Sequence, residues 1–160
     1  MAKPASPRQP PAIGEGKRGD TGHIAYLLRQ AQAAVRLALD TQLAASGMTT
    51  PQFLVLNLLD AYPGASGADL ARIAQLTPQT INLIVRKLEE EGLIERNNHE
   101  THGRVLRMDI TKAGKLRLRQ CKRLADDIEH QLLALADAQT QAVVRRWLVD
   151  VAMKLSAGQP

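Results

Sequence analysis

The chain has 160 residues, of which 44% are hydrophobic but only 2% aromatic, so we expect one folded domain with an aliphatic core. Its net charge of +5 and calculated isoelectric point of about 9.7 are compatible with an anionic partner such as nucleic acid. A single cysteine excludes an intramolecular disulfide, and no apolar run reaches the length of a membrane span or forms a signal-peptide core, so we expect a cytoplasmic protein.

The first 19 residues are rich in Pro, Gly, Lys and Arg, a composition typical of a disordered basic arm. Residues 14–19 match the glycine pattern of dinucleotide-binding loops, but no strand precedes them and no βαβ pattern surrounds them. A nucleotide site is therefore disfavoured. Contact between the arm and a DNA backbone, or no specific role, remain as interpretations.

Two helices are predicted next. Residues 21–45 carry one apolar stripe from Ile24 to Leu39, which indicates a long amphipathic helix. The following helix begins at Thr50 and Pro51 and is apolar on most sides through Leu59, which predicts that it is buried.

Residues 66–96 carry the most informative pattern of the chain. Ser66 and Asp69 fit a capping box at the start of a short helix, which ends near Gln75. A second helix begins at Thr77, a residue suited to cap it, and Gly92 is placed to end it in a left-handed turn. Two helices joined by a turn of a few residues are typical of a helix-turn-helix, whose second helix enters the major groove of DNA.

The second helix has two unlike faces. Ile81, Ile84, Val85 and Leu88 recur at spacings of three and four and form an apolar stripe. Another face carries Gln, Asn, Thr and Arg side chains, whose donors and acceptors match base edges. The alternative is an ordinary amphipathic helix with a polar exterior.

A hairpin is predicted after this helix. Residues 93–97 can form one strand, and residues 106–110 alternate apolar and polar side chains, which predicts a second strand. Arg104 lies near the tip of the connecting segment. The predicted fold is therefore mostly α-helical: a winged helix-turn-helix with a small antiparallel β-hairpin wing and a helical dimerisation region.

The order of elements resembles the MarR family of bacterial transcription regulators over residues 21–156. The resemblance is carried by residues 48–53 (MTTPQF), Leu70-Ala71, residues 85–94 (VRKLEEEGLI) and residues 110–114 (ITKAG). One position departs from the family pattern: the wing usually carries Asp-x-Arg, and here the segment reads His102-Gly103-Arg104. The resemblance implies a repressor of its own operon that releases DNA when a small, often aromatic acidic ligand binds, and a first helix that contributes to a dimer interface.

The C-terminal part predicts two further helices. Leu118, Cys121, Ile128 and Leu135 belong to one long apolar stripe, and Asp137 can cap a last helix that carries Trp147. Because such a stripe needs a partner, we expect a two-fold homodimer; packing within one subunit is the alternative. The position of Cys121 on the stripe predicts a buried structural thiol. The expected organisation is an arm at 1–19 and one regulator domain at 20–160, with a DNA-binding part at 46–112 and dimerisation helices at 20–45 and 113–157.

Residues 112–123 contain six cations and no acid, at a helix start where the macrodipole disfavours positive charge. An external phosphate would explain this run, and a solvated basic face is the alternative. The expected partner is double-stranded DNA that carries an inverted repeat. The residues expected to contact it are Ser66, Thr77, Gln79, Thr80, Asn82, Arg86, Arg104, Lys115 and Arg117.

An effector site is predicted on the first and last helices. Arg29 and Arg36 stand two turns apart on one face of the first helix, and His23 and Tyr26 precede them. With Trp147, these cations would suit an aromatic carboxylate or an aromatic acyl thioester of coenzyme A. A solvated Arg pair and a core Trp are the alternative.

No enzyme, cofactor or metal site is indicated. His99 and His102 resemble a zinc-protease signature that is one residue too short and lies in a predicted loop. The remaining alternative function is a helical dimerisation or adaptor protein whose winged motif binds protein instead of DNA.

Overall fold

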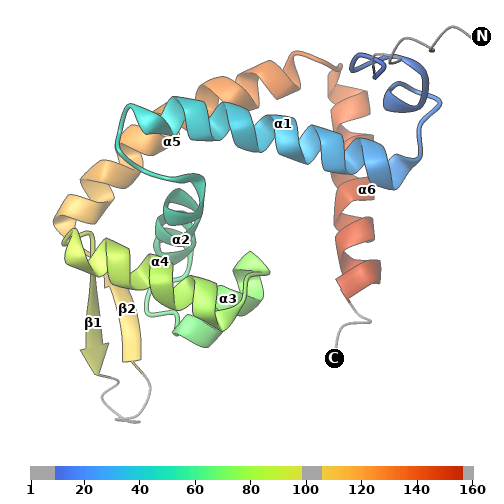
Figure 1. The fold of residues 1–160 in the computed structure, drawn as a ribbon. Coiled ribbons are helices and arrows are strands. Elements are labelled where there is room, and N and C mark those ends of the chain that lie inside the picture. Colours follow the sequence, from blue (N-terminus) through green and yellow to red (C-terminus); the bar gives the residue numbers. More distant parts are fainter. Residues whose placement is uncertain (1–9, 99–105, 157–160) are drawn as a thin grey trace, which may run out of the picture. The chain divides into compact units, whose positions relative to one another are not determined.

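The computed structural model describes residues 10–98 and 106–156, and confirms the mostly helical winged helix-turn-helix fold (Figure 1). The elements in chain order are a 3-10 helix η1 (Gly16–Arg18), α1 (Ile24–Ala44), α2 (Thr50–Ala61), α3 (Gly67–Ala74), α4 (Pro78–Glu90), β1 (Ile94–Asn98), β2 (Leu106–Ile110), α5 (Lys112–Leu133) and α6 (Ala138–Ser156). The chain divides into two compact units, Met1–Ala38 and Leu39–Pro160, with the boundary inside α1.

The N-terminal unit is more ordered than its composition predicts. Residues 10–19, expected to be part of a disordered arm, contain η1, and residues 1–9 lie outside the described part. Arg18 explains the difference: its Nε donates to Gln30 Oε1 at 3.1 Å and its Nη1 to the carbonyl of Pro11 at 2.8 Å. One side chain therefore ties this turn to α1, a long-range contact that composition does not reveal.

The C-terminal unit is built around one aliphatic core. The last turn of α1 contributes Leu43, and α4 turns its predicted apolar face inward, with Ile81, Val85 and Leu88 buried. In α3, Leu70 and Ala71 are buried, whereas Ile73 is 40% exposed. The core thus lies between the helix-turn-helix, α2, the hairpin and the first half of α5; its other members are Met48, Val55, Leu56, Leu59, Ala65, Leu93, Ile94, Met108, Leu118 and Cys121.

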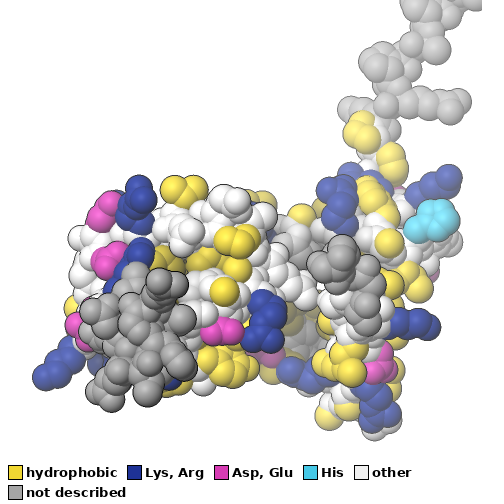
Figure 2. Space-filling view, turned by 90° about the horizontal axis from the view of Figure 1, so that it is seen from below, with side chains coloured by type: hydrophobic (Ala, Val, Ile, Leu, Met, Phe, Trp, Pro, Cys, Tyr) yellow, Lys and Arg dark blue, Asp and Glu magenta, His cyan; other side chains and the backbone are white. Residues whose placement is uncertain are grey.

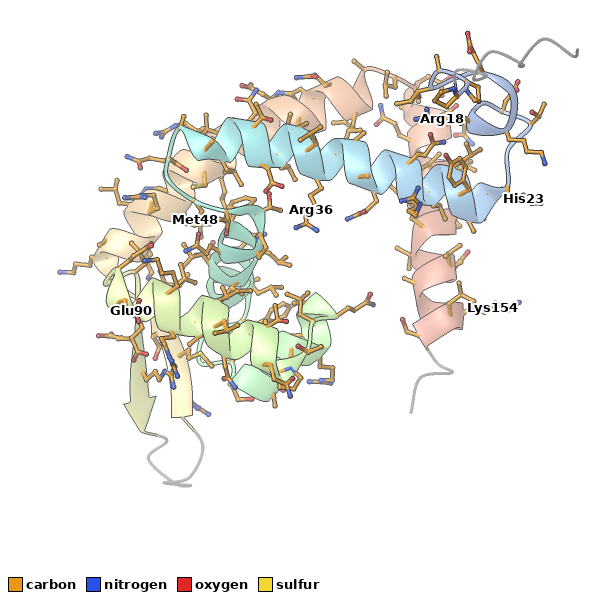
Figure 3. The ribbon with its side chains drawn as sticks, in the orientation of Figure 1. Arg18, His23, Arg36, Met48, Glu90 and Lys154 are labelled. Atoms are coloured by element: carbon orange, nitrogen blue, oxygen red, sulfur yellow. The ribbon has the colours of Figure 1, made fainter. Side chains whose placement is uncertain are left out.

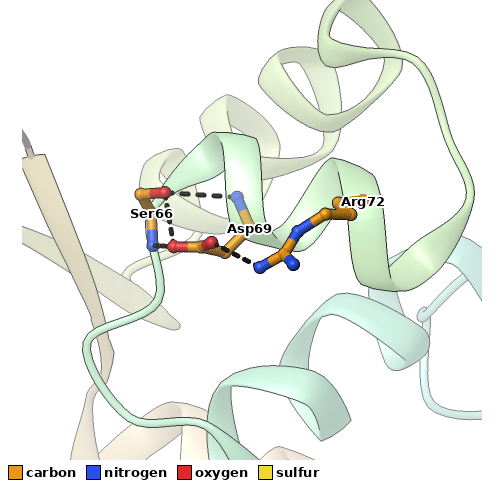
Figure 4. A network of polar contacts seen from close by, with 3 residues as sticks. All are labelled: Ser66, Asp69 and Arg72. Carbon is orange, nitrogen blue, oxygen red and sulfur yellow. Dashed lines mark hydrogen bonds and ion pairs between the residues drawn. The ribbon is translucent and has the colours of Figure 1, made fainter. Parts of the chain in front are cut away.

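The capping box at the start of α3 is formed as predicted (Figure 4). Ser66 Oγ donates to Asp69 Oδ2 at 2.7 Å and accepts from Asp69 N at 3.2 Å, and Arg72 Nη2 donates to Asp69 Oδ1 at 3.0 Å. These hydrogen bonds hold the pKa of the Asp69 carboxyl below its usual value, and those from Ser66 have the largest effect. The entry into the helix-turn-helix is thereby fixed by local polar contacts.

The start and end of α4 also follow the sequence. Thr77 Oγ1 accepts from Thr80 N at 3.2 Å, and Pro78 occupies the first turn. The turn before α4 passes through Gln75, which is left-handed at φ 53°, and Gly92 follows the end of α4 at φ 67°. The predicted cap and stop of this helix are confirmed.

The hairpin is antiparallel and pairs Arg96 with Met108. Its first strand begins at Ile94, one residue later than predicted. The Leu93 N–H donates to the carbonyl of Leu88 at 2.9 Å and so belongs to the end of α4, whereas its carbonyl accepts from Thr111 N at 3.1 Å, which is the next pair in the register of the hairpin. Leu93 is therefore bonded both to the end of α4 and to the base of the hairpin.

The end of α4 and the start of α5 approach each other closely. Thr111 Oγ1 donates to the carbonyl of Gly92 at 2.7 Å and accepts from Gly114 N at 3.0 Å. Gly114 is buried against Leu93, and a Cβ at this position would overlap the Leu93 carbonyl oxygen and stand 2.7 Å from Ile110 Cγ2. Only glycine fits here without a shift of backbone.

The last two helices differ in burial. α5 buries Leu118, Cys121 and Ile128, which confirms the predicted buried thiol, whereas α6 has no buried residue. Asp137 accepts from Thr140 N at 2.7 Å and caps α6 as expected. Several large apolar side chains of α6 are exposed: Val143, Val144, Trp147, Leu148, Val149, Met153 and Leu155. None of the helices in the described part of the chain combines the length and the apolar composition that a membrane span requires.

Replacing Gly114 by Ala is expected to destabilise the protein by about 1–3 kcal/mol, because the added methyl group overlaps a backbone carbonyl. Helix propensity alone predicts the opposite sign, a gain of about 1 kcal/mol. Urea unfolding followed by circular dichroism measures the difference. The exposed neighbour provides the control, since Ala113→Gly should lose about 1 kcal/mol from propensity alone. A Gly114→Ala protein as stable as the wild type would contradict the tight junction.

The Asp69 cap is expected to give the protein an acid-sensitive component of stability. Because the folded pKa of Asp69 lies below its unfolded value, the contribution is present at neutral pH and is lost as the pH falls below about 4. Asp69→Asn should therefore lower the free energy of unfolding at pH 7 and flatten its decline with acid. Asp126→Asn, at an exposed position of α5, serves as the control. If the free energy of unfolding declined equally with acid in the wild type and in Asp69→Asn, the cap would not contribute to the pH dependence of stability.

Candidate nucleic-acid interface

The outward face of α4 is a single row of exposed side chains. Gln79, Leu83, Arg86 and Glu90 follow one another at spacings of four, three and four, opposite the buried face of the helix. Neither Gln79 nor Arg86 has a side-chain hydrogen-bond or ion-pair partner within residues 10–98 and 106–156. Within that part of the chain, no contact occupies the donors and acceptors of these two side chains.

The other predicted reading residues of the helix-turn-helix are partly engaged. Asn82 is exposed but lies toward α3, with its Oδ1 4.0 Å from the point where a Cβ of Gly67 would stand. The hydroxyls of Thr77 and Thr80 are 2.9 Å apart and bonded to each other, and the Ser66 hydroxyl is bonded to Asp69. These three hydroxyls hold helix starts, and their contact with DNA stays a prediction.

Charges next to the outward row are neutralised in pairs. Lys87 Nζ lies 3.6 Å from Glu91 Oε1, and Arg96 Nε lies 3.1 Å from Glu89 Oε2. Both pairs are at least partly exposed, so each contributes little to stability. Their effect is to cancel two acids at the C-terminal end of α4, which leaves Arg86 as the cation of the outward row.

Two cations in the basic run of α5, Lys115 and Arg117, differ in their exposure and contacts. Lys115 is exposed and borders a small hollow with Asp60, Pro63 and Asp109. Arg117, by contrast, is half-buried, and its Nη1 donates to the carbonyl of Ser46 at 2.6 Å. This bond ties α5 to the connection between α1 and α2, a packing role that the sequence did not reveal. Phosphate contact by either residue remains a prediction, and Lys115 is the better placed of the two.

Arg107 was not among the predicted contacts. It is exposed on β2, and its side chain lies along the turn between α2 and α3, with Nη1 3.7 Å from the Cβ position of Gly64. The signal was present in the alternation of residues 106–110, where Arg107 occupies an outward position. Arg104, His99 and His102 lie outside the described residues.

The predicted effector residues fall on both units. His23, Tyr26, Arg29 and Arg36 belong to the N-terminal unit, where Arg29 stacks over the ring of Tyr26 with its Cζ 5.5 Å from the centroid. Figure 3 shows His23 at the start of α1 and Arg36 projecting from its second half. Trp147, 39% exposed, belongs to α6 in the other unit. The effector set therefore remains a prediction.

One apolar pocket lies between the end of α5 and α6 in the C-terminal unit. It has a volume of about 380 Å³ and is lined by Leu132, Leu135, Val144 and Leu148. Arg145 and Glu129 stand at its edge as an ion pair at 3.0 Å. Among the described residues there is no group of three or more His, Cys, Asp or Glu side chains that could hold a metal ion.

Comparison with known proteins agrees with this geometry. A model of the MarR family matches residues 46–105. The HTH-type transcriptional repressor Rv2887 of Mycobacterium tuberculosis is 33% identical over 129 residues, covering 81% of this chain and 93% of the relative.

Solved structures agree as well. Rv2887 in complex with DNA has a TM-score of 0.67 at 30% identity, covering 81% of this chain and 98% of that chain. Rv2887 with salicylic acid has a TM-score of 0.66 at 32% identity, covering 82% and 98%. The PcaV transcriptional regulator of Streptomyces coelicolor, in complex with its natural ligand, has a TM-score of 0.74 at 28% identity, covering 82% and 93%. With its winged helix-turn-helix and these relatives, the chain belongs to the MarR family of transcriptional regulators.

Proposed function

We propose that the protein is a cytoplasmic homodimeric repressor that binds an inverted-repeat operator through α4 and releases it when a small anionic aromatic ligand binds. The observation that carries the proposal is the outward row of α4, in which Gln79 and Arg86 are exposed and without partners in the described part of the chain. Such side chains form hydrogen bonds with base edges in the major groove. The DNA complex of Rv2887 supports the same use of the fold.

The surface of α6 supports a dimer. None of its side chains is buried, and the described part of the chain does not shield its exposed apolar residues from water. A second copy of this chain is the simplest partner that would bury these residues, because two-fold dimers dominate soluble oligomers. In this proposal, residues 46–112 bind DNA, and residues 20–45 and 113–157 form the dimer.

The effector is proposed as an aromatic acid or its coenzyme A thioester. The salicylic acid complex of Rv2887 supports the acid. In this chain Arg29 stacks over the ring of Tyr26, and Arg36, two turns further along the same face of α1, serves as the test of a carboxylate contact. An anion bound there releases DNA only if it favours a dimer whose two α4 helices are wrongly spaced.

A dimer with two α4 helices is expected to protect an inverted repeat whose half-site centres lie about 10 base pairs apart. The site can be selected from a random duplex pool and then footprinted. Inverting or deleting one half-site should abolish high-affinity binding. Protection of a single half-site by a monomer would contradict the proposal.

Arg86→Ala is expected to weaken operator binding by about 1–3 kcal/mol and to relax the base preference at one position per half-site. Lys87→Ala is the matched control, since the neighbouring cation is paired with Glu91. Lys115→Ala should weaken all sequences alike and make the salt dependence shallower by about one unit for each lost phosphate contact. Unchanged base preference in Arg86→Ala would show that α4 reads DNA with other side chains.

Calorimetry with salicylate, other aromatic acids and their coenzyme A thioesters is expected to detect binding to the wild type that weakens in Arg36→Ala, because the guanidinium would pair with the carboxylate or a phosphate. Lys17→Ala, another cation of the same unit, is the control. Full-strength binding to Arg36→Ala would remove Arg36 from the site. Absence of binding by either class would overturn the proposed effector.

A further inference from the structure

An apolar side chain occupies the centre of the outward row of α4. Leu83 is 68% exposed, although it lies on the helix that contributes Ile81, Val85 and Leu88 to the core. Its neighbours in the row are Gln79, four residues earlier, and Arg86, three residues later. A leucine at this position was not among the residues expected to contact DNA.

Packing within the protein does not account for Leu83. One flank of the side chain borders a shallow groove of about 390 Å³, which is also lined by Thr49, Gln52 and Lys87. The rest of the side chain faces outward. Isolated exposed leucines are common on protein surfaces and need no explanation by themselves. The position of Leu83 nevertheless indicates a role for its exposure, because Leu83 stands between two side chains whose donors are directed away from the core.

We propose that Leu83 recognises the 5-methyl group of a thymine in each operator half-site, which is an inference that rests on the proposed DNA-binding function. The thymine methyl group is the one apolar feature that a base pair presents in the major groove, and apolar side chains distinguish thymine by contact with it. Leu83 thereby adds an apolar contact to the hydrogen bonds expected from Gln79 and Arg86.

The spacing of the row locates the thymine. A helix rises 1.5 Å per residue, so Gln79 and Arg86 are about 10 Å apart along α4, a length comparable to about three base-pair steps. Leu83 lies between them and should face a base pair inside that interval. Glu90, the next member of the row, carries a negative charge that phosphates repel, so the DNA-facing part of α4 ends near Arg86.

Figure 2 views the molecule from below the orientation of Figure 1, with the β1–β2 end of the C-terminal unit toward the reader. Hydrophobic side chains as well as Lys and Arg reach the surface on this face.

The test removes the methyl group from the DNA and the side chain from the protein. In the operator obtained by selection, each thymine is replaced singly by deoxyuridine, which keeps base pairing and lacks only the methyl group. For the wild type, one position per half-site should lose about fourfold in affinity, the value expected for one buried methyl group. Replacing both symmetric thymines should cost about sixteenfold.

The paired measurement uses Leu83→Ala, whose folding is verified by circular dichroism. This variant should bind the thymine operator more weakly than the wild type, and the same deoxyuridine replacement should no longer change its affinity. Leu116→Ala, at an exposed leucine of α5, is the matched control and should keep the full loss on deoxyuridine DNA.

Two results would overturn the inference. One is a wild-type protein for which no single thymine methyl affects affinity; the other is a Leu83→Ala protein that shows the same loss on deoxyuridine DNA as the wild type. In both cases the selected operator is still bound specifically, so the proposed function stands. Failure of the selection to yield any specific site would instead reject DNA binding, and with it the inference.

Discussion

The arrangement of the winged helix-turn-helix depends on the contact between Gly92-Leu93 and the start of α5. The Thr111 hydroxyl bonds at once to the carbonyl of Gly92 and to the N–H of Gly114, and the Leu93 carbonyl accepts from Thr111 N. One threonine thus joins the end of α4, the base of the hairpin and the first turn of α5. The position of the wing relative to α4 follows from this joint, since β1 leaves it and β2 returns to it.

The polar residues of the helix-turn-helix divide into two groups with different tasks. Ser66, Thr77 and Asp69 satisfy backbone N–H groups at helix starts, where unpaired donors would be costly. Gln79 and Arg86 make no such contacts and remain exposed. The caps fix the direction in which the second group points, so a substitution in the first group would act on DNA binding through the geometry of α4 and not through a lost contact.

The sequence was most informative where structure is decided locally. The caps at Ser66 and Thr77 and the left-handed turn at Gly92 rest on backbone hydrogen bonds to near neighbours, and each was predicted correctly. The buried face of α4 followed from periodicity for the same reason.

Contacts between distant elements were not predictable in this way. The bond from Arg117 to Ser46 joins residues 71 positions apart, and the tie from Arg18 to Gln30 orders a segment whose composition predicts disorder. Leu83 was missed for another reason: an apolar residue on a helix was assigned no outward role, and only its exposure in the folded unit shows where it points.

The scarcity of aromatic residues has a practical consequence for studies in solution. The buried core described above contains no aromatic side chain, and the chain's only tryptophan, Trp147, is partly exposed on α6. Tryptophan fluorescence therefore reports on the surroundings of α6, while far-ultraviolet circular dichroism follows the helices of the whole chain. A change in emission without a change in dichroism would mark an event at α6 that leaves the winged core intact. The protein thus carries a built-in probe that separates the two parts of the C-terminal unit without any label.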